Sequence, residues 1–430
     1  METVATVGFA IVFFLFIIVS IGLHEIGHMV PAKLFGVRVP QYFIGFGPTL
    51  FSRTKGETQY GFKAFPLGGY VRLLGMYPPA SPHAGKPSRL AEFADEARAA
   101  EWDEISDEDV ANNRLLYQKK TWQRVVVMFA GPFMNILICF AIMWGIVGFY
   151  GTYQEQPIIA TVSACVLPAT STSQTCGAND PKSPAAQAGL KPGDTVVAFN
   201  GTQITSYTQL TTLIRDNMDG AATLTVLRGG QTITLPTVHT MVNQVASDTD
   251  PTATVQAGFL GVTPEENLVT GGPGDALSQM WTMTQQSVVA LGKLPVSVWN
   301  SVVGMVEQQP RSLDSPMSIV GASWVAGEAV SAPGIDWQAK VVMFASLLAS
   351  INLFLALFNL VPLPPLDGGH IAGAAYDWLR RQVAKLRRKV DPGPFDTAKW
   401  LPVAYAVTGF LIICGVALIV VDIVSPLNPF

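Results

Sequence analysis

The sequence has few charged residues. Asp, Glu, Lys and Arg make up only 13% of its 430 residues, against roughly 25% in an ordinary soluble domain. The formal net charge is −4, which provides no basic surface for nucleic acid and excludes that class of partner. Hydrophobic residues account for 49% of the chain. This balance predicts a membrane protein that also carries some polar, folded mass.

Long charge-free stretches divide the chain, and the first extends from Glu2 to Glu25. A transmembrane helix needs about 20 mostly apolar residues. Four runs reach that length: Val4 to about Val30, Val125 to Tyr150, Val341 to Leu360, and Leu401 to Val421. We therefore expect a polytopic α-helical membrane protein with about four transmembrane helices, in segments 1–34, 122–150, 341–372 and 401–430.

Lys and Arg are unevenly distributed among the connecting segments. Twelve lie between residues 32 and 122 and six within residues 380–389, whereas residues 151–339 contain only six. Lys and Arg favour cytoplasmic loops. We therefore expect segments 35–121 and 373–400 in the cytoplasm, and the middle of the chain and both termini outside.

Cysteine is scarce as well. Of four cysteines, Cys139 and Cys414 lie within apolar runs, where a thiol packs as a small hydrophobic group. Cys165 and Cys176 lie in the segment expected outside, where a disulfide can persist. Their spacing alone leaves open whether they are bonded.

The first cytoplasmic segment contains a β-hairpin pattern. Between Val37 and Leu74, aromatic and β-branched residues alternate with small or polar ones around a turn at residues 54–57. Such alternation predicts two paired strands. The hairpin either shields the membrane face or offers an edge strand to an extended peptide, and the sequence leaves both open.

Residues 151–243 predict a small extracytoplasmic α+β domain. A short helix after Ser183, a strand over residues 195–199, a turn at residues 200–201 and a helix capped by Ser206 follow in order. This order resembles a PDZ domain of the type associated with bacterial proteases. Such a domain binds peptide by strand addition or acts as a size filter or lid. Residues 244–340 are expected to form a linker and amphipathic helices on the outer membrane surface.

The end of the first apolar run carries the motif HEIGH. His24 and His28 are four residues apart, so in a helix they lie on one face and can share a metal. Glu25 lies on the adjacent flank, as the general base does in the HExxH motif of metalloproteases. Ionisable groups are costly in a bilayer, so their presence there points to function.

Two histidines do not complete a zinc site, which takes three protein ligands. The third apolar run ends in NLVPLPPLDGGH, which contributes Asp367 and His370. Both residue types suit zinc, and the residues alone leave the choice open. A third interpretation is that Asp367 only caps the helix that follows.

Taken together, HEIGH, GPFMN at residues 131–135, the PDZ-like segment and NLVPLPPLDGG resemble the site-2 proteases, intramembrane zinc metalloproteases. Within that family the chain is similar to the bacterial regulator of sigma-E proteases with a single PDZ domain. The resemblance covers essentially the whole chain. It implies a multi-pass protein of the bacterial inner membrane whose hairpin is a membrane-reentrant β-loop that pairs with substrate.

The resemblance also implies roles for individual residues. His24, His28 and Asp367 match the zinc ligands, and Glu25 matches the catalytic base. Asn359 matches the asparagine that holds the substrate backbone. The cofactor expected is Zn²⁺.

The expected activity is endopeptidase cleavage of single-span membrane proteins within or near the lipid bilayer. The resemblance implies trimmed anti-sigma factors as substrates and an upstream site-1 protease that trims them. Two other classes remain: a silent scaffold that displays a PDZ module, and a metal transporter. The scaffold needs neither metal ligands nor Glu25, and the transporter leaves Glu25 and the PDZ-like segment without a role.

Overall fold

The computed structural model describes residues 2–79, 89–166, 176–177, 180–246, 254–312 and 314–427. The chain divides into two compact units. The helical unit comprises Met1–Phe149 and Gly272–Phe430, and the β-rich unit comprises Tyr150–Gly271.

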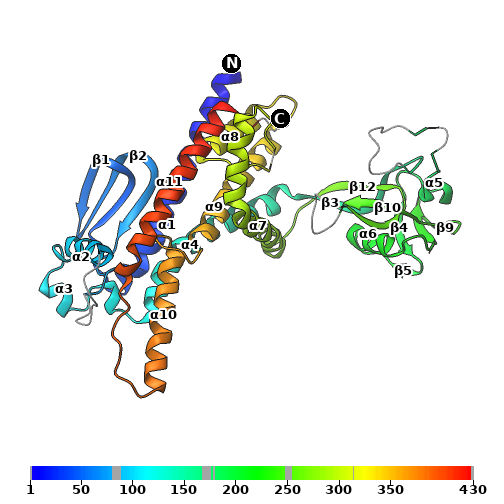
Figure 1. Ribbon diagram of the computed structural model, residues 1–430. Helices are drawn as coiled ribbons and strands as arrows, with labels where there is room; N and C mark the ends of the chain where they lie inside the picture. The colour runs from blue at the N-terminus through cyan, green and yellow to red at the C-terminus, as the bar shows by residue number, and fades with distance from the viewer. Residues whose placement is uncertain are drawn as a thin grey trace. The chain divides into compact units, whose positions relative to one another are not determined.

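Long apolar helices dominate the helical unit (Figure 1). Among the described residues, five helices are long and apolar enough to cross a membrane. They are built on α1 (Glu2–Leu34), α4 (Thr121–Gly145), α7 (Pro273–Val306), α9 (Trp337–Asn359) and α11 (Leu401–Val424). The shorter α8 (Ile319–Ser331) and α10 (Asp367–Leu386) flank α9 in the chain. The predicted class, a polytopic helical membrane protein, is confirmed.

Helix α7 is not among the spans predicted from sequence. It is a single continuous helix of 34 residues and the least apolar of the five, with Lys293 and Pro295 in its second half. Its length and composition allow it to cross a membrane. The count of four spans is therefore not confirmed, and the surface position of α7 stays a prediction.

Helices α1 and α9 run in the same direction. Phe344 of α9 packs edge-on against Phe13 of α1, with ring centroids 4.9 Å apart. Eight residues later Asn352 donates a hydrogen bond of 3.1 Å to Ser20 of α1. The later residue of α9 thus contacts the later residue of α1, so the two helices are parallel. Their carboxyl ends therefore lie in the same region of the bundle.

The predicted hairpin forms from β1 (Gln41–Lys55) and β2 (Thr58–Arg72), with Gly56 at the turn in a left-handed conformation, φ 63°. The strands fold over one another, so residues 41–44 have partners at both 59–62 and 69–72. The last part of β2 is thereby placed at an edge of this small sheet, next to α1. Large apolar side chains of the hairpin are exposed: Phe46, Leu50, Phe51, Phe62 and Phe65.

A buried carboxylate holds the chain that leaves β2. Glu101 of α2 (Arg89–Trp102) accepts hydrogen bonds from three consecutive backbone N–H groups, those of Gly75, Met76 and Tyr77, at 2.8, 2.9 and 3.0 Å. Burial raises the pKa of Glu101, and these bonds oppose the rise. The bonds fix the segment after β2, which contributes a wall of the cavity described below. The short α3 (Asp107–Ala111) follows α2.

The β-rich unit is a sheet with strand order β12-β3-β4-β7-β8, covered by the short helices α5 (Pro184–Ala188) and α6 (Tyr207–Asp216) around one apolar core. The main strands are β3 (Thr152–Val162), β4 (Thr195–Phe199), β7 (Leu224–Arg228), β8 (Gln231–Thr234) and β12 (Val262–Val269). The smaller strands are β5 (Thr202–Gln203), β6 (Ala221–Ala222), β9 (Val238–His239), β10 (Met241–Ala246) and β11 (Thr254–Phe259).

Local signals in this unit were predicted correctly. Ser183 caps α5, which Gly189 ends in the left-handed conformation, φ 77°, and Ser206 caps α6. Asn200 and Gly201 both have positive φ at the turn after β4. A disulfide joins Cys165 and Cys176, so the bond that spacing left open is present. The assignment of this unit as a PDZ domain stays a prediction.

The β-rich unit extends beyond the segment predicted from sequence. The predicted domain ends at residue 243 and is followed by a linker, whereas the compact unit ends at Gly271. The reason is that β12 pairs antiparallel with β3 along almost its whole length. A strand that returns to pair with the first strand of its domain leaves no local mark of that pairing in the sequence.

Candidate functional site

The two histidines of HEIGH lie in the last third of α1, and both are buried. Their rings meet edge-to-face, with centroids 4.8 Å apart. His28 donates from Nδ1 to the backbone carbonyl of Val127 in α4, at 2.8 Å. In a neutral imidazole this bond leaves Nε2 with a lone pair. The Nε2 atom of His28 is therefore suited to bind a metal.

Asp367 is brought to the histidines by a sharp change in chain direction. Helix α9 ends at Asn359, and α10 begins at Asp367 itself. The connection between α9 and α10 is compact: Gly368 and Gly369 lie against backbone atoms of residues 360–364. A Cβ on Gly369 would stand 2.6 Å from the nitrogen of Pro364. The N-cap of α10 is Leu366, with no side-chain cap. The interpretation of Asp367 as a helix cap is therefore wrong.

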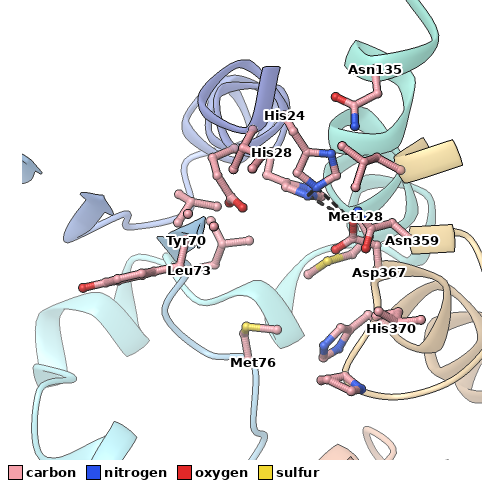
Figure 2. Close-up of a pocket in the computed structure, with 18 of the residues that line it drawn as sticks. His24, His28, Tyr70, Leu73, Met76, Met128, Asn135, Asn359, Asp367 and His370 are labelled. Carbon is pink, nitrogen blue, oxygen red and sulfur yellow. Dashed lines mark hydrogen bonds and ion pairs between the residues drawn. The ribbon is translucent and has the colours of Figure 1, made fainter. Parts of the chain in front are cut away.

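Three atoms from these side chains converge (Figure 2). Nε2 of His24 and Nε2 of His28 are 3.2 Å apart, and they lie 3.4 and 3.3 Å from Oδ2 of Asp367. Ligand atoms at about 2.0–2.2 Å from a tetrahedral zinc ion are separated by about 3.3–3.6 Å. Two imidazoles and one carboxylate at these separations fit a zinc ion with a fourth position left for another ligand.

His370 does not join this group. It lines the same cavity, but the group of convergent ligand atoms in the described residues consists of His24, His28 and Asp367. Figure 2 shows the His370 ring apart from the converging atoms. The geometry therefore favours Asp367 over His370, a choice that the residue types alone left open.

The three side chains open onto a cavity of about 440 Å³ that Glu25 and Asn359 also line. Glu25 lies against the edge of β2, where a Cβ on Gly69 would stand 3.2 Å from Cγ of Glu25. The structure thus brings all the predicted site residues to one cavity, together with the free edge of the hairpin.

One lining residue was missed from sequence. Asn135 of α4 is 1% exposed and borders the cavity. In the sequence, GPFMN contributes only to the family resemblance. The available signal was the spacing: Gly131 and Asn135 are four residues apart, as His24 and His28 are.

Gly131 is where α4 makes room for the site. A Cβ at Gly131 would collide with the Nε2 of His28, whereas a Cβ at Gly145 in the same helix meets nothing within 4 Å. We expect Gly131→Ala to displace the His28 ring, lower zinc binding and destabilise the protein by about 1–3 kcal/mol. Gly145→Ala is expected to be neutral or to stabilise α4 by up to about 1 kcal/mol. Bound zinc and thermal unfolding in detergent measure both effects, and equal behaviour of the two variants would contradict the prediction.

Comparisons with known proteins show which family the chain belongs to. Residues 12–390 match peptidase family M50. The chain is similar to the zinc metalloprotease Rip1 of Mycolicibacterium smegmatis, with 34% identity over 98% of this chain and 99% of the relative. It is also similar to Rip1 of Mycobacterium tuberculosis, with 33% identity over 98% of each chain. Because the match extends from the histidine pair through Asp367, the chain belongs to peptidase family M50, the site-2 proteases, and is a metalloprotease.

Proposed function

We propose that this metalloprotease cleaves single-span membrane proteins within or near the bilayer, with Zn²⁺ held by His24, His28 and Asp367. The observation that carries the proposal is the set of three separations, 3.2, 3.4 and 3.3 Å, between the two Nε2 atoms and Oδ2. Two of them fall within the edge lengths of a zinc coordination tetrahedron, about 3.3–3.6 Å, and the third is about 0.1 Å shorter. The names of the Rip1 relatives support zinc as the cofactor.

Zinc bound there would supply Lewis-acid chemistry, polarising the scissile carbonyl and acidifying water. Glu25 is the proposed general base. Its carboxylate lies beside the histidine pair and the edge of β2, within the cavity. It takes a proton from the attacking water and returns it to the amine that leaves.

Substrate binding is proposed for Asn359 and for the edge of β2. A transmembrane helix hides its carbonyl groups in internal hydrogen bonds, so it must unwind before cleavage. An extended substrate segment added to β2 regains backbone hydrogen bonds. Gly68, Gly69 and Val71 of that strand line the cavity, as does Asn359. The substrate backbone would therefore pass between the strand and the metal ligands.

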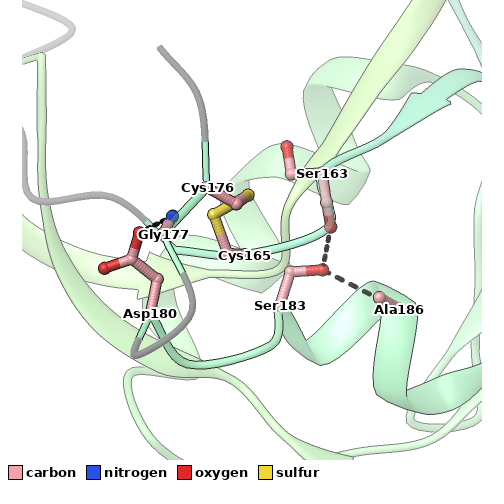
Figure 3. The surroundings of a disulfide bond; sticks show 7 residues. All are labelled: Ser163, Cys165, Cys176, Gly177, Asp180, Ser183 and Ala186. Carbon is pink, nitrogen blue, oxygen red and sulfur yellow. Dashed lines mark hydrogen bonds between the residues drawn. A yellow bond between two sulfur atoms is a disulfide. The ribbon is translucent and has the colours of Figure 1, made fainter. Parts of the chain in front are cut away.

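The β-rich unit is proposed to be an extracytoplasmic PDZ-like domain that excludes untrimmed substrates by size. The Cys165–Cys176 disulfide (Figure 3) supports an oxidising compartment for this unit. The localisation that follows is the bacterial inner membrane, with the basic segments in the cytoplasm. The proposed substrates include anti-sigma factors that a site-1 protease has already trimmed.

The experiment uses the full-length protein in lipid vesicles with a single-span substrate, supplied both intact and with its external part removed. We expect cleavage of the trimmed form in the presence of zinc, loss of cleavage on chelation, and recovery when zinc returns. Mass spectrometry of the products locates the cut bond. A cut far outside the apolar segment, or cleavage that survives removal of zinc, would overturn the proposal.

A further inference from the structure

Helices α1 and α4 pack in opposite directions with a fixed register. Gly131 of α4 lies against the ring of His28. Ile142 lies eleven residues after Gly131 in α4, and Ile17 lies eleven residues before His28 in α1. Ile142 packs on the cluster that contains Ile17. Position 24 of α1 therefore lies level with position 135 of α4. The pairing of Gly131 with His28 repeats one turn further on as Asn135 with His24.

The two histidines differ in how their second ring nitrogen is used. Nδ1 of His28 donates to the carbonyl of Val127. Nδ1 of His24 is buried, and no described residue serves as its hydrogen-bond partner. Asn135 is in a matching position, because its Oδ1 is also buried without a partner in the described part of the chain. A buried donor and a buried acceptor at the same level of two packed helices each carry an unfavourable desolvation cost.

We infer that Asn135 is a positioning residue for His24: its amide oxygen accepts the Nδ1 proton of the ring. The inference rests on the proposed function, in which His24 is a zinc ligand. A histidine that binds metal through Nε2 usually donates Nδ1–H to a carbonyl or carboxylate, which fixes the ring and makes Nε2 a better ligand. Val127 performs this task for His28, and Asn135 performs it for His24.

The bond is not present in the structure and requires a rotation of the Asn135 side chain. Figure 2 shows Asn135 beside the histidine pair with its amide directed toward His24. A half-turn about the Cβ–Cγ bond exchanges the oxygen and the nitrogen of an asparagine amide. With the oxygen toward His24, the NH₂ group is left for the cavity, which Asn135 also lines.

A different role for Asn135 makes different predictions. If its NH₂ group acted only as a donor to the substrate carbonyl, its loss would slow cleavage and leave zinc affinity unchanged. An orienting acceptor instead affects zinc binding with no substrate present. Asn135→Asp separates the two roles, because a carboxylate keeps the acceptor and has no N–H to donate.

The test measures zinc affinity by competition with a chelator, in the Glu25→Gln background so that no cleavage occurs. Loss of an outer hydrogen-bond partner of a ligand costs about 10–100-fold in metal affinity. We expect Asn135→Leu to weaken zinc binding by about that factor, and Asn135→Asp to bind zinc at least as tightly as the parent. Unchanged affinity in Asn135→Leu, or equal losses in both variants, would overturn the inference.

Two further variants make the result specific. Asn352→Leu is the matched control: Asn352 is also a fully buried asparagine with an unpartnered Oδ1, but it lies level with Ser20 and is not a lining residue of the cavity. We expect it to keep the parent affinity for zinc; a loss equal to that of Asn135→Leu would assign the effect to helix packing and overturn the inference. His24→Ala is expected to lose zinc. Retention of zinc by His24→Ala would refute the ligand set of the proposed function. That outcome is distinct from a failure of the inference about Asn135.

Discussion

Glu25→Gln is expected to bind zinc as the parent protein does and to cleave a trimmed single-span substrate about 10²–10⁴-fold more slowly. Glutamine has nearly the shape of glutamate, keeps one carbonyl oxygen and fits the same place against Gly69 of β2. It cannot take up a proton at neutral pH. Glu25 also lies outside the group of three convergent ligand atoms, so its loss removes the base and leaves the metal site intact.

The measurement pairs zinc content with single-turnover cleavage in vesicles. Glu25→Asp is the matched variant, because it keeps a carboxylate but shortens the side chain by one methylene. We expect its rate to lie between those of the parent and Glu25→Gln. If Glu25→Gln cleaves as fast as the parent, Glu25 is not the base. If the Glu25→Gln variant loses zinc, the role of Glu25 is to hold the metal.

The sequence predicted those features that a few neighbouring residues determine. The pairing of His24 with His28 follows from helical spacing alone. The turn at Gly56 and the cap at Ser206 are likewise local choices, and the structure has both. Such features are set by backbone preference, so they can be recognised without knowledge of the rest of the fold.

The remaining features depend on segments that are distant in the chain. The fit of Gly131 to His28 joins residues 103 positions apart, and the return of β12 to β3 joins both ends of one unit. The choice of Asp367 over His370 depended on where α10 begins. Helix α7 was ambiguous because its polar residues suit either a surface helix or a weakly apolar span. Only the packed arrangement resolves contacts of this kind.

Asp367→Ala is expected to abolish zinc binding and cleavage together, whereas His370→Ala is expected to retain zinc. The two residues are separated by less than one helical turn and line the same cavity, so they form a matched pair of variants. Only Asp367 places an oxygen, Oδ2, 3.4 and 3.3 Å from the two histidine Nε2 atoms. Its removal leaves two protein ligands, fewer than the three that catalytic zinc sites use.

The size of the loss in zinc affinity shows whether Asp367 is a direct ligand or an outer hydrogen-bond partner. An outer partner costs about 10–100-fold in metal affinity, so a direct ligand is expected to cost more than that. Asp367→Asn sharpens the comparison, because it keeps the shape and the start of α10 but replaces a charged donor oxygen with a neutral one. We expect its zinc affinity to lie between those of the parent and Asp367→Ala. If His370→Ala loses zinc while Asp367→Ala retains it, the third zinc ligand is His370 and not Asp367.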